Sequence, residues 1–310
     1  MMKIKKVSLI GLGAIGAAYG SKLNEVESIS LKVIASKDRI ERYSKQGFDV
    51  NGKKYNFDFI SPEEDIEPAD LILVSVKYHH LKHTIEDMRK HVGPNTIILS
   101  LLNGISSEEI LGNEYGMRKM LYAMCVAIDA VREGTNIKFS NIGKIVFGEK
   151  DNTYSENVLA VEELFDKAEI PYEIPENIMR SLWWKFMVNV GINQVSAVLR
   201  APYGVFQKSN KALGLIKNSM EEVIEISKKI GINLEIKDID EFIDIMMELS
   251  PNGKTSMCQD IEAGRKTEVD MFAGTIYKLG LEHGVNTPVN KMLYDMIKVL
   301  EQMDEIKKYT

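Results

Sequence analysis

Cysteine, tryptophan and long apolar runs are all scarce in this chain of 310 residues. Its only cysteines, Cys125 and Cys258, are far apart in the sequence. That excludes a disulfide scaffold and a thiolate metal site, and it fits a reducing compartment. No apolar run approaches the roughly 20 residues that span a bilayer. The apolar start of the chain imitates a secretory signal, but three glycines interrupt it. We therefore expect a soluble, cytoplasmic protein that has no membrane partner.

A basic block is also missing. The chain has 39 Lys and Arg residues against 45 Asp and Glu, a net charge of −6, and the charges are spread along its length. This pattern gives no reason to expect a nucleic-acid partner. Three histidines, His79, His80 and His83, have the helical spacing of metal ligands, but no third ligand lies nearby. We expect no metal site.

The first half of the chain alternates short apolar runs with helical periodicity, which is typical of a parallel sheet covered by helices. Predicted strands cover residues 6–11, 31–35, 71–76, 97–101, 121–126, 145–147 and 171–174, with helices at 14–24 and 79–91. The second half is predicted to be helical at 180–199, 211–230, 239–249, 255–280 and 288–307. The expected architecture is an α/β domain with a doubly wound parallel sheet over residues 1–175, followed by an all-helical domain over 176–310.

A glycine-rich motif follows the first predicted strand and opens the first predicted helix. Its residues are Gly11, Leu12, Gly13, Ala14, Ile15 and Gly16. This context is the one that a dinucleotide-binding fingerprint requires. The glycines permit a tight turn, close approach to a pyrophosphate and close packing of helix on strand, and the helix N-terminus supplies amide donors. The alternative is a glycine-rich turn that binds no ligand.

The end of the second predicted strand selects between NAD and NADP, because a carboxylate there holds the ribose hydroxyls of NAD. This strand ends on Ser36, with Lys37 and Arg39 close by. A 2′-phosphate would meet a hydroxyl and positive charge, so NADP is favoured and NAD is the less favoured cofactor. The alternatives are that these cations form only a solvated helix start, or that Asp38 reaches the ribose.

Two further polar residues follow predicted strands, where ligands lie in open α/β sheets. Lys77 comes directly after the strand at 71–76, and Asn103 with Gly104 comes after the strand at 97–101. Both are candidates for the cofactor side of a site. Ordinary loop chemistry explains an Asn-Gly pair equally well.

Within the helix predicted at 180–199, the stretch from Trp183 to Asn193 is nearly all apolar except at intervals of four residues. Lys185, Asn189 and Asn193 therefore share one face. A helix that is apolar almost all round is expected to be buried, and burying amides without partners is costly. A bound ligand would supply hydrogen-bond partners for these buried groups. The alternative is that the same residues form the solvent-exposed face of an amphipathic helix.

A second row at intervals of four residues is predicted on the helix at 255–280. Its members are Ser256, Asp260, Gly264 and Glu268. Glycine in mid-helix costs about 1 kcal/mol relative to alanine, which suggests close approach by a bulky group. A surface cluster of ion pairs is the alternative for Glu268.

By these residues the sequence resembles the ketopantoate reductase family, the 2-dehydropantoate 2-reductases, over nearly its whole length. The matching pieces are the Gly11 to Gly16 motif, Lys77, Asn103-Gly104, Trp184-Lys185 with Asn189 and Asn193, and the stretch from Ser256 to Asp270. The resemblance implies a Rossmann-type domain that binds NADPH and a helical domain that closes over a small 2-keto acid. The implied reaction reduces 2-dehydropantoate to (R)-pantoate in pantothenate and coenzyme A biosynthesis.

The resemblance also implies individual roles. Lys185 would be the general acid, and the residues in contact with substrate would be Lys185, Asn189, Asn193 and Ser256. Lys77 and Asn103 would lie on the cofactor side, and Glu268 would help to position the cofactor. Two departures stand out. Ser36 replaces an arginine that many relatives use for the 2′-phosphate, and Gly253 replaces an asparagine expected three residues before Ser256.

Other functions remain open on the sequence. A reductase of another 2-keto acid fits the Gly253 departure. A β-hydroxyacid dehydrogenase also pairs a Rossmann domain with a helical domain and a catalytic lysine. A nicotinamide-binding sensor would need no proton donor at Lys185. The sequence leaves the oligomeric state open, a homodimer included.

Overall fold

The computed structural model describes residues 3–307, with side chains described as far as residue 303. The chain divides into two compact units, and the division falls between Ile178 and Met179. The predicted boundary near Pro175 lies just before this division. Each unit is described by itself.

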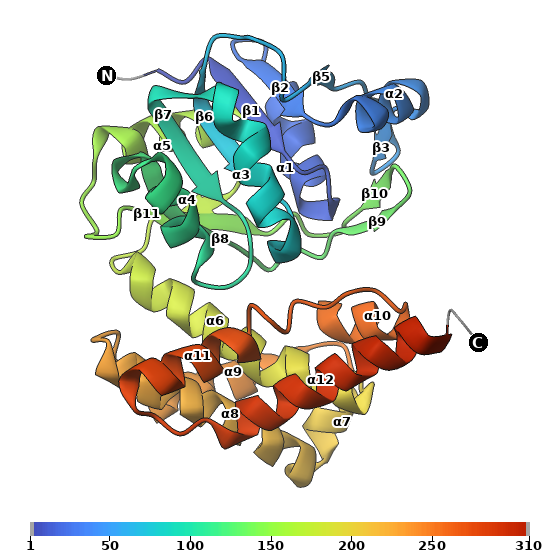
Figure 1. Cartoon of the computed structure of the whole chain (residues 1–310), viewed down its shortest axis with the longest axis vertical. Coiled ribbons are helices and arrows are strands. Elements are labelled where there is room, and N and C mark those ends of the chain that lie inside the picture. The colour runs from blue at the N-terminus through green and yellow to red at the C-terminus, as the bar shows by residue number, and fades with distance from the viewer. Residues whose placement is uncertain (1–2, 308–310) are drawn as a thin grey trace. The chain divides into compact units, whose positions relative to one another are not determined.

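The N-terminal unit is built on an eight-stranded sheet with the order β12-β11-β8-β7-β6-β1-β2-β5 (Figure 1). Its strands are β1 (Lys6–Ile10), β2 (Ser30–Ile34), β5 (Asp58–Ile60), β6 (Ala69–Val74), β7 (Val92–Ser100), β8 (Met120–Val126), β11 (Lys144–Gly148) and β12 (Tyr172–Glu173). Strands β5, β2, β1, β6, β7 and β8 pair in parallel, and β11 pairs antiparallel to β8. The parallel strands therefore end at one common edge of the sheet.

Alternation along the strands divides the apolar residues between the two faces of the sheet. The helices of this unit are α1 (Ala14–Asn24), α2 (Lys37–Gln46), α3 (Leu81–Met88), α4 (Ser107–Tyr115) and α5 (Glu156–Lys167). One face of the sheet, which includes Leu9 and Leu73, packs with α1 and α5 residues in one buried cluster. The other face, which includes Ile72 and Val74, packs with α3 and α4 residues in a second cluster. Helices on both faces confirm the predicted doubly wound architecture.

A smaller four-stranded sheet, with the order β4-β3-β10-β9, lies beside α1 (Figure 1). Its strands are β3 (Phe48–Val50), β4 (Lys53–Tyr55), β9 (Val131–Glu133) and β10 (Asn136–Lys138). Strand β10 pairs in parallel with β3, which joins two distant parts of the sequence. This sheet was not predicted, because its strands are only three residues long and give too short a period-2 signal in the sequence.

The C-terminal unit contains helices and no strands among its described residues. Its helices are α6 (Ile178–Leu199, which begins at the last residue of the N-terminal unit), α7 (Tyr203–Lys208), α8 (Asn210–Lys229), α9 (Ile236–Glu248), α10 (Ser256–Glu262), α11 (Ala273–His283) and α12 (Pro288–Lys307). Gly191 allows α6 and α8 to approach closely, since a Cβ there would lie 2.5 Å from Cε of Met220. An α/β unit followed by a helical unit confirms the predicted fold class.

The prediction of one helix over 255–280 was wrong. Helix α10 ends at Glu262, and α11 begins only at Ala273. Gly264 lies between them with φ of +60°, and nothing approaches within 4 Å of an added Cβ. This glycine therefore serves a left-handed turn rather than a close helix contact, and the predicted row from Ser256 to Glu268 does not share one helix face.

Candidate functional site

The glycine motif lies at the carboxyl edge of the main sheet, between the end of β1 and the start of α1. Gly11 has φ of +99°, and a Cβ there would lie 2.2 Å from the carbonyl oxygen of Ser75, the residue that follows β6. A Cβ on Gly16 would lie 2.0 Å from the carbonyl oxygen of Gly11. Packing inside the protein therefore accounts for these two glycines.

Gly13 is different. It is the N-cap residue of α1 with φ of −68°, and only the carbonyl oxygen of Ser75, at 4.0 Å, approaches an added Cβ. Neither backbone conformation nor internal packing requires glycine at this position. A group that approaches the backbone from outside does account for it, as a pyrophosphate does in dinucleotide-binding loops.

The other strand ends bring the remaining predicted residues to the same edge. Register pairs Ile10 with Ile34 on β2 and with Val74 on β6, and Val74 in turn with Ser100 on β7. Ser36, Lys77 and Asn103 therefore follow neighbouring strand ends. The structure brings these residues and the glycine motif to one edge of one unit.

The β2 end carries the predicted cofactor-selecting residues. Ser36 is the N-cap residue of α2, but its side chain makes no capping hydrogen bond. Lys37 is exposed, and its Nζ lies 2.6 Å from Oε2 of Glu63, also exposed. The hydrogen bond from Lys37 lowers the pKa of Glu63, and the same contact raises the pKa of Lys37. A 2′-phosphate at Lys37 would compete with this carboxylate.

A buried carboxyl group supports the loop that carries Asn103. Ser100 donates a hydrogen bond of 2.8 Å to Oγ of Ser107, which donates one of 2.9 Å to Oε2 of Glu108. The second oxygen of Glu108 has no hydrogen-bond partner among the described residues. Burial raises the pKa of Glu108 to about 7. Glu108 gives no signal of its burial in the sequence, because an acidic residue in the first turn of a helix is normally a surface residue.

In the helical unit, α6 carries the predicted polar row. Asn193 is buried, and its Nδ2 donates a hydrogen bond of 3.1 Å to Oδ1 of Asn189. Nδ2 of Asn189 is buried with no hydrogen-bond partner in the described part of the chain. Lys185 is half-buried one turn before Asn189. Leaving a buried amide donor without a partner costs about 1–3 kcal/mol, which a ligand acceptor would recover.

Ser256 is tied to this helix through its neighbour. Thr255 is the N-cap residue of α10, and its Oγ1 accepts a hydrogen bond of 3.2 Å from the backbone of Cys258. The hydroxyl of Thr255 also contacts the hydroxyl of Ser196 on α6, which donates to the carbonyl of Asn193 at 3.0 Å. The first residue of α10 is therefore fixed relative to Asn193.

Glu268 lies in the turn before α11. Thr267 donates from its backbone and its hydroxyl to Oε1 of Glu301 on α12, at 2.8 and 2.7 Å. On the other side, Asp270 accepts a hydrogen bond of 2.8 Å from the hydroxyl of Tyr294. Two anchors on α12 thus hold the segment that presents Glu268, although it is not helical as predicted.

Gly253, the predicted departure, packs against an aromatic ring. A Cβ at this position would lie 3.0 Å from Cδ2 of Tyr203, whose backbone donates a hydrogen bond of 2.9 Å to the carbonyl of Gly253. A larger side chain at this position would have to displace the ring of Tyr203.

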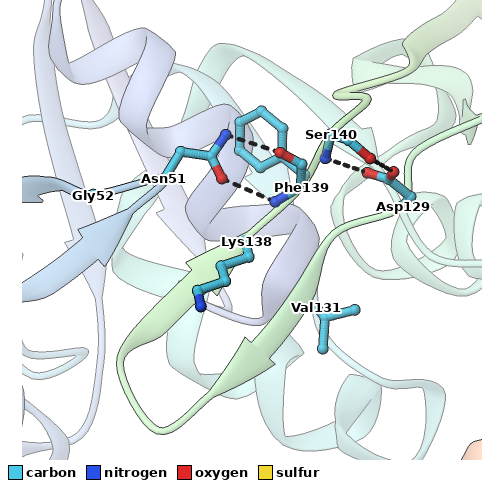
Figure 2. A pocket seen from close by; sticks show the side chains of 7 residues that line it. All are labelled: Asn51, Gly52, Asp129, Val131, Lys138, Phe139 and Ser140. Atoms are coloured by element: carbon cyan, nitrogen blue, oxygen red, sulfur yellow. Dashed lines mark hydrogen bonds between the residues drawn. The ribbon is translucent and has the colours of Figure 1, made fainter.

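A surface hollow of about 560 Å³ in the N-terminal unit contains none of the predicted site residues. It is lined by Asn51, Gly52, Asp129, Val131, Lys138, Phe139 and Ser140 (Figure 2). The Asn51 amide bonds to the backbone of Phe139, and Asp129 accepts from Ser140. These polar groups hold loop ends together. Among the side chains described for residues 3–303, no three from His, Cys, Asp or Glu are placed to hold a metal ion. No described helix is long and apolar enough to span a membrane.

Comparison with known proteins gives matches over both units. The family model described as Ketopantoate reductase PanE/ApbA matches residues 7–152, and its C-terminal counterpart matches residues 177–301. The 2-dehydropantoate 2-reductase of Pyrococcus horikoshii is 28% identical over 302 residues, which cover 96% of this chain and 98% of that protein. That of Archaeoglobus fulgidus is 25% identical over 300 residues, 97% of this chain and 99% of that protein.

Solved structures share the fold. A 2-dehydropantoate 2-reductase from Geobacter metallireducens superposes with a TM-score of 0.85 at 24% identity, covering 96% of this chain and 99% of that one. A D-mandelate dehydrogenase with NADH and anilino(oxo)acetate superposes with a TM-score of 0.87 at 22% identity, covering 97% of this chain and 99% of that one.

The glycine loop on a doubly wound sheet, the helical unit that follows and these relatives together identify an oxidoreductase with a Rossmann-type unit. Both halves of one family description match, and between them they cover most of the sequence. The chain belongs to the ketopantoate reductase family.

Proposed function

We propose that this chain catalyses the NADPH-dependent reduction of 2-dehydropantoate to (R)-pantoate, a step of pantothenate and coenzyme A biosynthesis, in the cytoplasm. The observation that carries the proposal is the polar row on α6. Lys185, Asn189 and Asn193 share one face of the otherwise apolar stretch of α6 from Trp183 to Asn193, and Nδ2 of Asn189 is buried without a described partner. A small acid with carbonyl and carboxylate oxygens supplies the acceptor that the Asn189 amide lacks.

The N-terminal unit would hold the cofactor. The open side of Gly13 fits a pyrophosphate, and residues 11–16 would surround it with backbone amides. The hydroxyl of Ser36, which makes no capping hydrogen bond, and the ammonium of Lys37 would bind the 2′-phosphate. Lys77 and Asn103 would lie on the nicotinamide side of the same sheet edge. When bound, NADPH supplies the hydride.

The C-terminal unit would bind and protonate the keto acid. Negative charge develops on the ketone oxygen during reduction, and Lys185 would stabilise this charge and donate a proton to the oxygen. Asn189, Asn193 and Ser256 would orient the hydroxyl and carboxylate groups of the substrate. Glu268, held by its anchored turn, would help to position the cofactor.

A second candidate substrate is another 2-keto acid with a larger apolar side chain. The observation that favours it is the contact between Gly253 and the ring of Tyr203, three residues before Ser256. An aromatic wall there would receive an apolar group better than a hydroxyl. The similar D-mandelate dehydrogenase structure holds an aromatic oxoacid.

The direct test of the mechanism is Lys185→Ala. We expect turnover of 2-dehydropantoate to fall by about 10²–10⁴-fold, the usual contribution of a general acid. NADPH affinity, measured by titration calorimetry, should be retained. Lys229→Ala is the matched control, because Lys229 is exposed at the end of α8 in the same unit. Full turnover by the Lys185 variant would remove this residue from the mechanism.

The proposed assembly is a homodimer. The ketopantoate reductase of Staphylococcus aureus, with a TM-score of 0.82 at 20% identity and coverage of 96% of this chain and 99% of that one, is described as dimeric. Light scattering after gel filtration tests the proposal for this chain, and a mass near 35.0 kDa would contradict it.

A further inference from the structure

Arg132 on β9 reaches the glycine motif from a part of the sequence 120 residues away. Its Nη1 donates a hydrogen bond to the carbonyl oxygen of Leu12, between Gly11 and Gly13. Its Nε donates to the carbonyl of Gly134 at 2.7 Å, which fixes the guanidinium on its own hairpin. One side of the guanidinium therefore binds its own hairpin, and the other side binds the backbone of the glycine loop.

The same guanidinium contacts the helix that follows the β2 end. Its Nη2 donates a hydrogen bond of 3.2 Å to the hydroxyl of Tyr43 on α2. Its Cζ lies 5.6 Å from the centroids of both the Tyr43 and Phe48 rings, within the range of a cation–π contact. Tyr43 is buried and packs against Phe48 at 5.0 Å between centroids. Arg132 therefore joins the glycine loop to α2 through a rigid aromatic cluster.

The bond to Leu12 has a consequence for the neighbouring residue. In a trans peptide the carbonyl and the N–H point in opposite directions. A donor that holds the carbonyl of Leu12 therefore also sets the direction of the Gly13 N–H, at the one glycine of the motif that packing does not explain. The planar fork of arginine can hold this carbonyl and the Tyr43 hydroxyl at once, which a lysine ammonium on a flexible stem does poorly.

We propose that Arg132 is a positioning residue for the dinucleotide site. It orients the Leu12–Gly13 peptide and fixes the glycine loop relative to α2, so that the pyrophosphate and ribose ends of one cofactor meet prearranged donors. The inference rests on the proposed binding of a nicotinamide dinucleotide in this loop. Cofactor affinity would then depend on Arg132, a residue that takes no part in the proposed proton transfer.

The test is Arg132→Gln in the full-length protein, with NADPH and NADH as titrants in calorimetry. We expect both dissociation constants to rise by about 10- to 100-fold, as for the loss of a charge-assisted hydrogen bond. Turnover at saturating NADPH should fall far less than affinity. Lys37→Gln is the comparison variant, and it should weaken NADPH binding much more than NADH binding.

Hydrogen exchange in the cofactor-free protein gives a second readout, which does not depend on the cofactor. Arg132→Gln should speed amide exchange at residues 11–16 and leave exchange in the helical unit unchanged. If the wild-type protein binds neither dinucleotide, the proposed function fails, but faster exchange at the loop still supports the positioning role. Unchanged exchange together with unchanged affinities would overturn the inference, and so would a loss confined to NADPH.

Two milder variants keep the inference testable if Arg132→Gln does not fold. Arg132→Lys retains the charge but not the fork, and Tyr43→Phe retains the ring but not the hydroxyl. We expect both to fold, with Arg132→Lys weakening both dinucleotides several-fold and Tyr43→Phe weakening them less. Wild-type affinity and wild-type loop exchange in Arg132→Lys would contradict a role for the paired contacts of the guanidinium with Leu12 and Tyr43.

Discussion

The two units of this chain build their candidate sites from different materials. In the N-terminal unit the site is mostly backbone, with glycines and strand ends at one edge of a parallel sheet. In the helical unit it is made of side chains on α6, on α10 and in the turn before α11, held by buried and partly buried hydrogen bonds. A backbone site leaves a continuous sequence motif, whereas a side-chain site leaves scattered residues whose supports lie elsewhere in the chain.

The largest predicted difference is between alanine substitutions at two glycines of the same motif. Gly11→Ala should destabilise the fold by about 4 kcal/mol, since left-handed backbone costs about 1–2 kcal/mol and overpacking against Ser75 about 1–3 kcal/mol more. Gly13→Ala has open space and should leave the free energy of unfolding within about 0.5 kcal/mol. Urea denaturation with NADPH titration separates the two effects.

Gly13→Ala should nevertheless weaken NADPH binding by about tenfold or more, because a methyl group would occupy the space of the approaching pyrophosphate. Equal destabilisation by the two alanines, or full NADPH affinity in Gly13→Ala, would contradict a backbone site.

The next effect concerns Glu108 beneath the Asn103 loop. Burial raises its pKa to about 7 from an unfolded value of 4.5, so the native state keeps a proton that the unfolded state releases. The free energy of unfolding should therefore fall as pH rises from about 4.5 to 7, by about 3 kcal/mol in all at 1.36 kcal/mol per pKa unit. Glu108→Gln should remove this dependence and be more stable than wild type at pH 8. Parallel stability curves for the two proteins, measured by denaturation from pH 5 to 8, would refute this account.

A smaller effect is expected in the helical unit. Asn189→Leu removes the unpartnered amide of Asn189 but also removes the acceptor for the amide of Asn193. Because these two effects oppose each other, the free energy of unfolding should change by no more than about 1 kcal/mol. KM for the keto acid should rise about tenfold. Gln194→Leu is the contrasting variant on the same helix, because Gln194 is bonded to Val190, Asn290 and Ala273. It should lose about 2–4 kcal/mol of stability, so equal stability losses in the two variants would count against a ligand at Asn189.

The smallest effects concern cofactor choice at the β2 end. Lys37 and Glu63 are both exposed, so water and salt screen their interaction and it contributes little to stability. Lys37→Gln should lower the ratio of NADPH to NADH in kcat/KM by about fivefold, and Glu63→Gln should raise it by a smaller factor. Both shifts should shrink at high salt. If Lys37→Gln leaves the ratio unchanged, the cation that receives the 2′-phosphate lies elsewhere.

Sequence periodicity predicted most of the fold because strong local patterns determine most of its elements. The predicted helix at 14–24 and the last helix at 288–307 match α1 and α12 residue for residue. The helix predicted at 255–280 was wrong because the periodicity continues through Gly264, while contacts of Thr267 and Asp270 with α12 hold a turn there. Contacts between distant residues leave no local signal.

The candidate site divides in the same way. The glycine motif and the polar row on α6 could be found from spacing alone. Arg132 could not, because its partner Leu12 is 120 residues away and a lone arginine in a polar hairpin resembles any surface cation. Glu108 and the Ser196–Thr255 contact are equally invisible without the structure.

The central claim is that this chain reduces 2-dehydropantoate with NADPH. The most direct measurement is the initial rate of reduced-nicotinamide consumption by the purified wild-type protein with 2-dehydropantoate, first with NADPH and then with NADH. We expect rapid turnover that is faster with NADPH than with NADH. Tight NADPH binding without turnover of 2-dehydropantoate, together with turnover of an apolar 2-keto acid, would contradict it and favour the substrate suggested by the Tyr203 contact at Gly253.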